Sequence, residues 1–129
     1  MATLGVAGSD PVFSLAVLPD GRLAAGHVDS SFAIRVWDVK RCALDAVISG
    51  HTESVWALAA LPDGRLLSGS GDLTLRVWGE APLSVRGGAG SNVCAATLQG
   101  HTSDVWALLV LPDRRVVSGS ADGTLRVWQ

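Results

Sequence analysis

An internal repeat constrains this sequence more than any single residue does. Residues 50–78 (GHTESVWALAALPDGRLLSGSGDLTLRVW) and 100–128 (GHTSDVWALLVLPDRRVVSGSADGTLRVW) align without a gap and agree at 20 of 29 positions. A looser copy, with two extra residues near Ser30 and Ser31, occupies residues 11–37. The chain is therefore three copies of one unit, and its fold must be built by repeating that unit.

Each copy has the pattern of short strands separated by tight turns. In the second copy VWALAAL is an apolar run of strand length, LPDG favours a turn, and RLLSGS pairs back. A second turn leads to LTLRVW, and an apolar stretch before the next Gly-His provides a fourth strand. The first strands are apolar on both faces, which favours sheets stacked face to face. In the third copy Arg114 replaces the turn glycine, where we expect a positive φ and a cost of about 1 kcal/mol.

Four-stranded units of about 40–45 residues that begin with Gly-His and close with tryptophan resemble WD repeats, which form the blades of β-propellers. Gly-His stands at 50–51 and 100–101, Ser-Gly-Ser-x-Asp at 68–72 and 118–122, and the closing Trp-Asp at 37–38. The resemblance implies an all-β fold with β-propeller blades of four antiparallel strands. Three blades are expected, at about 11–49, 54–99 and 104–129. Residues 2–8 echo 95–101 and are expected to supply the fourth strand of the third blade.

The resemblance also assigns a buried hydrogen-bond network to each regular blade, formed by a histidine, a strand serine, a turn aspartate and the tryptophan indole. In the first copy Ala25 stands at the serine position, and only Asp29 and Trp37 remain. The same residue types could form a catalytic triad, but a nucleophilic serine must reach its substrate, so we favour the structural interpretation and expect no catalytic residue. The network residues are His51, Ser68, Asp72 and Trp78 in the second copy, and His101, Ser118, Asp122 and Trp128 in the third.

Propellers of this family bind partners at the rim of the central channel, near the start of each first strand. The rim of this chain would be aromatic, and aromatic side chains are common hot spots of protein interfaces. The alternative, that these rings only pack between adjacent blades, stays open. No arginine stands at these positions, which disfavours capture of a phosphopeptide. The residues assigned to partner binding are Phe13, Trp56, Trp106, Ser54 and Asp104.

Composition excludes several classes of partner. Ten basic residues against twelve acidic ones, with a single lysine, give no basic run for a nucleic acid. The apolar runs are far shorter than the roughly 20 residues of a membrane-spanning helix. The amino terminus lacks signal-peptide features, which favours the cytoplasm or nucleus. Cys42 and Cys94 fit no metal-ligand spacing, so we expect reduced, buried thiols and no metal or cofactor.

The leading hypothesis is a non-catalytic scaffold that presents a propeller face to a protein or peptide ligand. Residues 54–78 are similar to the ubiquitin-binding propellers of the phospholipase-activator family, which implies, as an alternative, an adaptor in ubiquitin-dependent protein turnover. Closed propellers have roughly 4–8 blades, so three blades are expected to be either a partial propeller, as in a piece of a longer chain, or one part of an assembled ring. Self-assembly is therefore a second alternative, in which a homo-oligomer of two copies would complete a ring of six blades. A propeller hydrolase is the third, although paired carboxylates, metal clusters and phosphate loops are absent outside the repeats.

Overall fold

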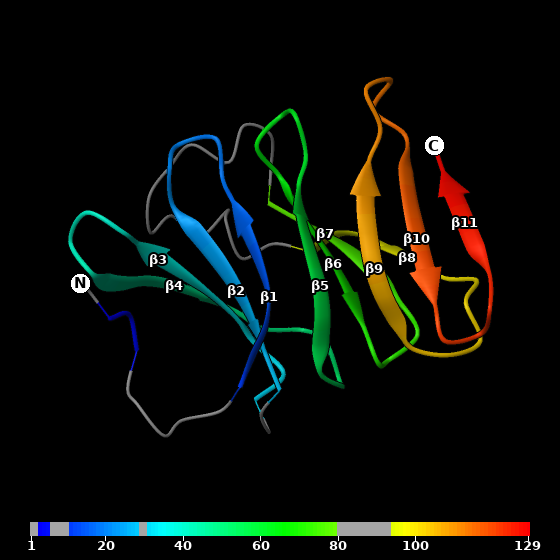
Figure 1. The fold of residues 1–129 in the computed structure, drawn as a ribbon, viewed down its shortest axis with the longest axis horizontal. Coiled ribbons are helices and arrows are strands. Elements are labelled where there is room, and N and C mark those ends of the chain that lie inside the picture. Colours follow the sequence, from blue (N-terminus) through cyan, green and yellow to red (C-terminus); the bar gives the residue numbers. More distant parts are fainter. Residues whose placement is uncertain (1–2, 6–10, 29–30, 80–93) are drawn as a thin grey trace.

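The computed structural model describes residues 3–5, 11–28, 31–79 and 94–129, and these form three separate antiparallel sheets with no helix (Figure 1). In each sheet the strands pair in chain order, as in a meander. The all-β fold of three blades is confirmed. The first sheet contains β1 (Val12–Val17), β2 (Leu23–His27), β3 (Ile34–Asp38) and β4 (Ala43–Ile48). The second contains β5 (Val55–Ala60), β6 (Leu66–Ser70), β7 (Leu75–Trp78) and β8 (Cys94–Leu98). The third contains β9 (Val105–Val110), β10 (Val116–Ser120) and β11 (Leu125–Trp128).

The Leu-Pro-Asp turn is built identically in all three sheets. In the second sheet the Leu61 N–H donates to the Arg65 carbonyl at 2.8 Å, and the Gly64 N–H donates back to Leu61 at 2.9 Å. The Asp63 carboxylate accepts from the backbone N–H and from Nε of Arg65. The turn therefore closes through backbone hydrogen bonds, and the aspartate side chain holds the residue directly before the next strand.

The sheets stack face to face, with the first strands β1, β5 and β9 side by side (Figure 1). Leucine, isoleucine, valine and tryptophan side chains from facing sheets fill the two spaces between them. Burial of these apolar groups is the main favourable contribution to folding. The first space is filled by Leu18, Ala24, Ile34, Val36, Ile48, Val55, Leu58, Leu66 and Trp78, and the second by Leu61, Leu67, Leu75, Val105 and Val116.

The third sheet has three strands in the described part of the chain, and β11 forms its outer edge. Most of residues 2–8, expected to supply a fourth strand there, lies outside the described residues. Residues 3–5 form no strand, and Gly5 lies beside the Trp37 ring of the first sheet.

Two smaller observations complete the fold. Cys42 and Cys94 are free thiols, but both are exposed, so the expectation that they are buried is wrong. Each lies in the outer part of its sheet, Cys42 in the turn before β4 and Cys94 at the first position of β8. Within the described ranges, no helix is long and apolar enough to cross a membrane.

Arg114 tests the turn chemistry directly. Its φ is 72°, whereas glycine fills the equivalent positions, Gly21 with φ 90° and Gly64 with φ 93°. The predicted positive φ is confirmed. A non-glycine residue with this φ costs about 1–2 kcal/mol. Glycine removes that strain, but it also raises the conformational entropy of the unfolded chain, which offsets part of the gain in stability. We expect Arg114→Gly to raise the free energy of unfolding by about 0.5–1 kcal/mol in urea denaturation.

The matched control is the reverse exchange, Gly64→Arg in the second sheet, which should lower the free energy of unfolding. If Arg114→Gly lowered stability as well, backbone strain at this turn would not be the governing term.

Candidate functional site

A buried polar cluster in the second sheet joins four side chains. Nδ1 of His51 lies 2.7 Å from Oδ2 of Asp72, and Nε2 of His51 lies 2.6 Å from Oγ of Ser68. The Trp78 indole N–H donates to the same Oγ at 2.7 Å. One assignment satisfies every group: the indole donates to the serine hydroxyl, the hydroxyl donates to Nε2, and the Nδ1–H donates to the carboxylate.

The third sheet repeats this cluster. His101 lies 2.8 Å from Asp122 through Nδ1 and 2.6 Å from Ser118 through Nε2. The Trp128 indole N–H donates to Ser118 at 2.8 Å. Agreement within 0.1 Å across the two sheets follows from identical residues at identical spacing.

Strand register places the members of the cluster. Ser68 lies in the middle of β6 and Trp78 at the end of β7, paired with Leu66 two residues before the serine. Asp72 lies in the turn between those strands, where its Oδ1 accepts from the N–H and hydroxyl of Thr74. The cluster therefore fastens the β6–β7 turn to the segment that enters β5.

Electrostatics around Asp72 favour its ionised form. Burial alone would raise its pKa, but hydrogen bonds from His51 and Thr74 and the Thr52 N–H outweigh burial and hold the pKa well below the usual range. In the third sheet the Thr124 hydrogen bond is the largest influence on Asp122 and, with those from His101 and Thr102, holds its pKa low as well.

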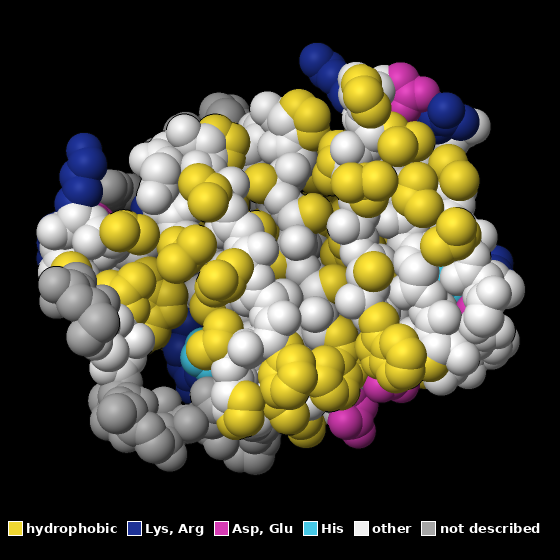
Figure 2. All heavy atoms as spheres, viewed as in Figure 1, with side chains coloured by type: hydrophobic (Ala, Val, Ile, Leu, Met, Phe, Trp, Pro, Cys, Tyr) yellow, Lys and Arg dark blue, Asp and Glu magenta, His cyan; other side chains and the backbone are white. Residues whose placement is uncertain are grey.

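A second group of side chains lies where β1, β5 and β9 begin. The Phe13 and Trp56 rings meet edge to face with centroids 5.2 Å apart. The Trp56 indole N–H donates to Oδ2 of Asp104 at 3.0 Å, which links the second sheet to the third. Phe13 and Trp106 are each 57% exposed. Figure 2 shows hydrophobic side chains gathered beside acidic ones at this end of the stack.

Backbone hydrogen bonds support this aromatic rim, defined as Phe13, Trp56 and Trp106. In each sheet the carbonyl of the residue before the first strand accepts from the N–H of the residue that directly follows the second strand. The Gly71 N–H donates to Ser54 at 3.0 Å, and the Ala121 N–H donates to Asp104 at 2.9 Å. The first sheet has the equivalent bond from Val28 to Pro11 at 3.1 Å. The rim is thus held by the sheets rather than by free loops.

The WD40 family model, described as WD domain, G-beta repeat, matches residues 2–38, 43–79 and 92–129. The chain belongs to the WD40-repeat family. WD40 repeats generally serve as scaffolds for protein interaction and are typically non-catalytic. No curated protein matches this WD40 chain.

In the second and third WD40 blades the serine, histidine and aspartate have the distances of a catalytic triad, but the serines are inaccessible. Ser68 and Ser118 are 0% exposed, and each hydroxyl already contacts an indole N–H and an imidazole nitrogen. A nucleophile in this position has no room for a substrate carbonyl. The arrangement supports a structural role for both clusters.

The first WD40 blade lacks this cluster in its described part. Ala25 stands at the serine position of β2, and Asp29 lies outside the described residues. His27 is buried, with no hydrogen-bond partner at either ring nitrogen among the described residues, so it does not replace the missing histidine.

The sequence predicted the rim residues individually but not the contacts of Trp56 with Phe13 and Asp104. No signal within one repeat reveals them, because they join different blades. Among the described residues, no three His, Cys, Asp or Glu side chains are arranged to hold a metal.

Removing a cluster serine should destabilise the fold. Ser68→Ala leaves the Trp78 indole N–H and Nε2 of His51 buried without their partner, and each such loss costs about 1–3 kcal/mol. Because two groups lose their partner, we expect the free energy of unfolding in urea to fall by at least about 2 kcal/mol. Thr52→Ala, at an exposed residue of the same segment, is the matched control and should change it by less than about 0.5 kcal/mol. Equal effects of the two variants would contradict the network.

Acid should weaken the same clusters. The folded-state pKa of Asp72 lies below that of an unfolded aspartate, about 3.9, so its ionised form stabilises the fold above that pH. This contribution is lost as the pH falls through the unfolded pKa toward the folded one. We expect the free energy of unfolding, measured in urea from about pH 6 to pH 3, to fall toward acid. The fall should be shallower in Asp72→Asn, and equal slopes for the two proteins would argue against this account.

Proposed function

We propose that this WD40 protein is a non-catalytic scaffold that binds a protein or peptide at its aromatic rim. One observation carries the proposal: three successive blades each place a ring at the same end of the stack, and two of those rings remain more than half exposed. Exposed aromatic side chains supply large contact area at low entropic cost, and they are enriched among interface hot spots.

The surroundings of the rim indicate the chemistry of its ligand. The Glu53 side chain is exposed two residues before β5, and the Asp104 side chain is half-buried directly before β9. Asp104 is held by the Trp56 indole, so its charge stays beside the rings. We propose a ligand with an apolar anchor for Trp106 and a basic residue next to it. Carboxylates in this position repel a phosphopeptide.

Ubiquitin is a narrower candidate within the same proposal. It is supported by the similarity of residues 54–78 to ubiquitin-binding propellers, and Trp56 lies within that stretch. Binding of ubiquitin at the rim would make the chain an adaptor in ubiquitin-dependent protein turnover.

The test uses peptides selected from a displayed random library on the purified chain. We expect selected peptides to combine an apolar residue with lysine or arginine. Trp106→Ala should weaken their binding by at least about 30-fold, the loss expected when a hot spot is removed. Val39→Ala, at an exposed apolar residue in the β3–β4 turn, is the matched control and should change affinity less than about twofold.

Selected peptides that bind equally well to wild type and Trp106→Ala would contradict rim binding. Purified ubiquitin is titrated in parallel by nuclear magnetic resonance. Absence of binding, or binding that is insensitive to both Trp56→Ala and Trp106→Ala, would eliminate ubiquitin while leaving the peptide result to decide on the scaffold.

A further inference from the structure

Each sheet of this chain has two distinct apolar faces. We define the upstream face as the one toward the preceding sheet and the downstream face as the one toward the following sheet. Where the first sheet meets the second, Ala24, Ile34 and Val36 of its downstream face pack against the upstream face of the second. The two faces are therefore different surfaces that fit together in one order. The upstream face of the second sheet comprises Leu58, Leu66 and Trp78.

The second junction repeats the first with equivalent residues. The downstream face of the second sheet contributes Leu67, Leu75 and Val77. The third sheet packs against it with its upstream face, whose residues stand 50 positions after their equivalents in the second sheet. One docking geometry has thus been used twice within the chain. The residues of this third upstream face are Leu108, Val116 and Trp128.

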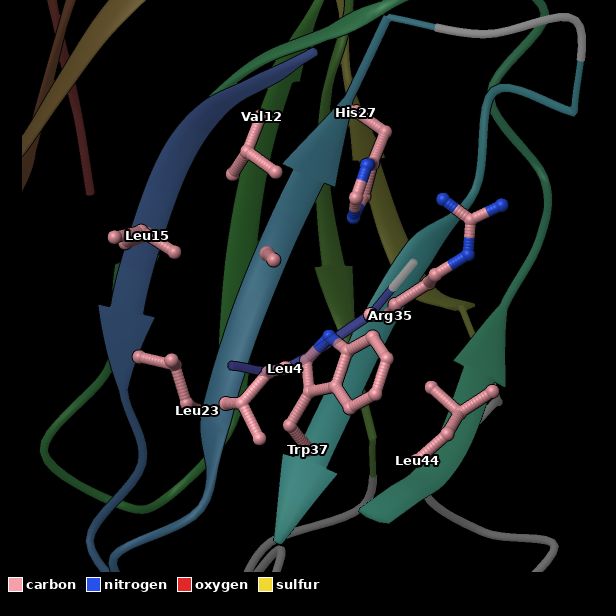
Figure 3. A pocket seen from close by; sticks show the side chains of 10 residues that line it. Leu4, Val12, Leu15, Leu23, His27, Arg35, Trp37 and Leu44 are labelled. Carbon is pink, nitrogen blue, oxygen red and sulfur yellow. The ribbon is translucent and has the colours of Figure 1, made fainter. Parts of the chain in front are cut away.

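The same two faces are open at the two ends of the stack. The upstream face of the first sheet, with Leu15, Leu23 and Trp37, borders a hollow of about 440 Å³ (Figure 3). Leu15 is 60% exposed, although its equivalents Leu58 and Leu108 lie at junctions. The open hollow has the lining that a neighbouring sheet covers elsewhere in the fold.

The downstream face of the third sheet is open as well. Leu125 is 77% exposed and Val127 is 55% exposed, whereas their equivalents Leu75 and Val77 lie at the second junction. Each outer face of the described stack thus exposes large apolar side chains, and large exposed apolar faces mark association sites.

We propose that the downstream face of the third sheet docks on the upstream face of the first sheet in a second copy of this chain. In two copies of this 129-residue chain, each with three sheets in its described part, two such contacts close a ring of six blades with twofold symmetry. This inference goes beyond the rim proposal, because it concerns the sheet faces and not their ends. The two open faces should fit each other because their residues are equivalent to those that pack together at the two junctions within the chain.

The segment before the first sheet supports the same arrangement. A Cβ added at Gly5 would lie 3.9 Å from the Trp37 ring, and the Gly50–Trp78 and Gly100–Trp128 pairs make the corresponding approach. At the internal junctions the fourth strand of one sheet leads directly into the next sheet. Docking of a second copy would bring its residues 3–5 toward β11, whose outer edge is free in the described part of the chain. Free strand edges readily pair with another chain.

The test is the mass of the purified 129-residue chain by light scattering, with two charge variants on the open faces. We expect twice the single-chain mass of 13.3 kDa. Leu15→Asp and Leu125→Lys should each weaken association by at least about 30-fold, because each places an unpaired charge in an apolar contact. Mixing the two variants should restore the dimer, since one of its two contacts is then wild type and the other pairs opposite charges. Val39→Asp, an exposed apolar position on neither face, is the control and should remain dimeric.

Circular dichroism of each variant checks that the sheets are formed, as expected for substitutions at exposed positions. A folded wild-type monomer would overturn the proposal. So would a mass above two copies, a dimer unaffected by either variant, or a mixture that fails to reassociate, because the last result indicates contacts between like faces.

Discussion

The structure depends on the burial of apolar sheet faces against each other. Each sheet consists of strands of four to six residues, and no sheet has an interior of its own. Leu66 and Leu75 lie on opposite faces of the second sheet, and both are fully buried. Leu66 packs against the first sheet and Leu75 against the third. A blade therefore gains its stability from packing against neighbouring blades, which explains why the sequence repeats one pattern of apolar positions.

The polar clusters solve a different problem, the positioning of turns. Apolar packing is not directional, whereas the chain of hydrogen bonds from Trp78 through Ser68 and His51 to Asp72 fixes where the β6–β7 turn lies relative to the strand that follows His51. The first sheet folds in the same pattern with Ala25 at the serine position, so the cluster is not required for the strand pairing itself. We attribute its presence to precision of the turn, and hence of the rim that the neighbouring backbone hydrogen bonds support.

The sequence predicted what one repeat contains and missed what joins two repeats. Strands, turns and the four cluster residues could be placed because they recur at fixed spacing, and the positive φ of Arg114 followed from glycine at its equivalents. The hydrogen bond of Trp56 to Asp104 could not be predicted, because it depends on how two blades are placed side by side. The exposure of Cys94 was missed for a related reason: its place at the outer end of β8 follows from strand order, not from the general preference of cysteine for burial.

The rim and the open faces are separate surfaces, so partner binding and assembly can operate together on the same stack. The central claim is that every apolar blade face is matched by the opposite face of another blade. The most direct measurement is cross-linking with a short bifunctional thiol reagent in a background of Cys42→Ser and Cys94→Ser. We predict that Leu15→Cys mixed with Leu125→Cys forms a covalent dimer of one copy of each, while neither variant alone cross-links to itself. Cross-linking within a single variant, or none in the mixture, would contradict the account.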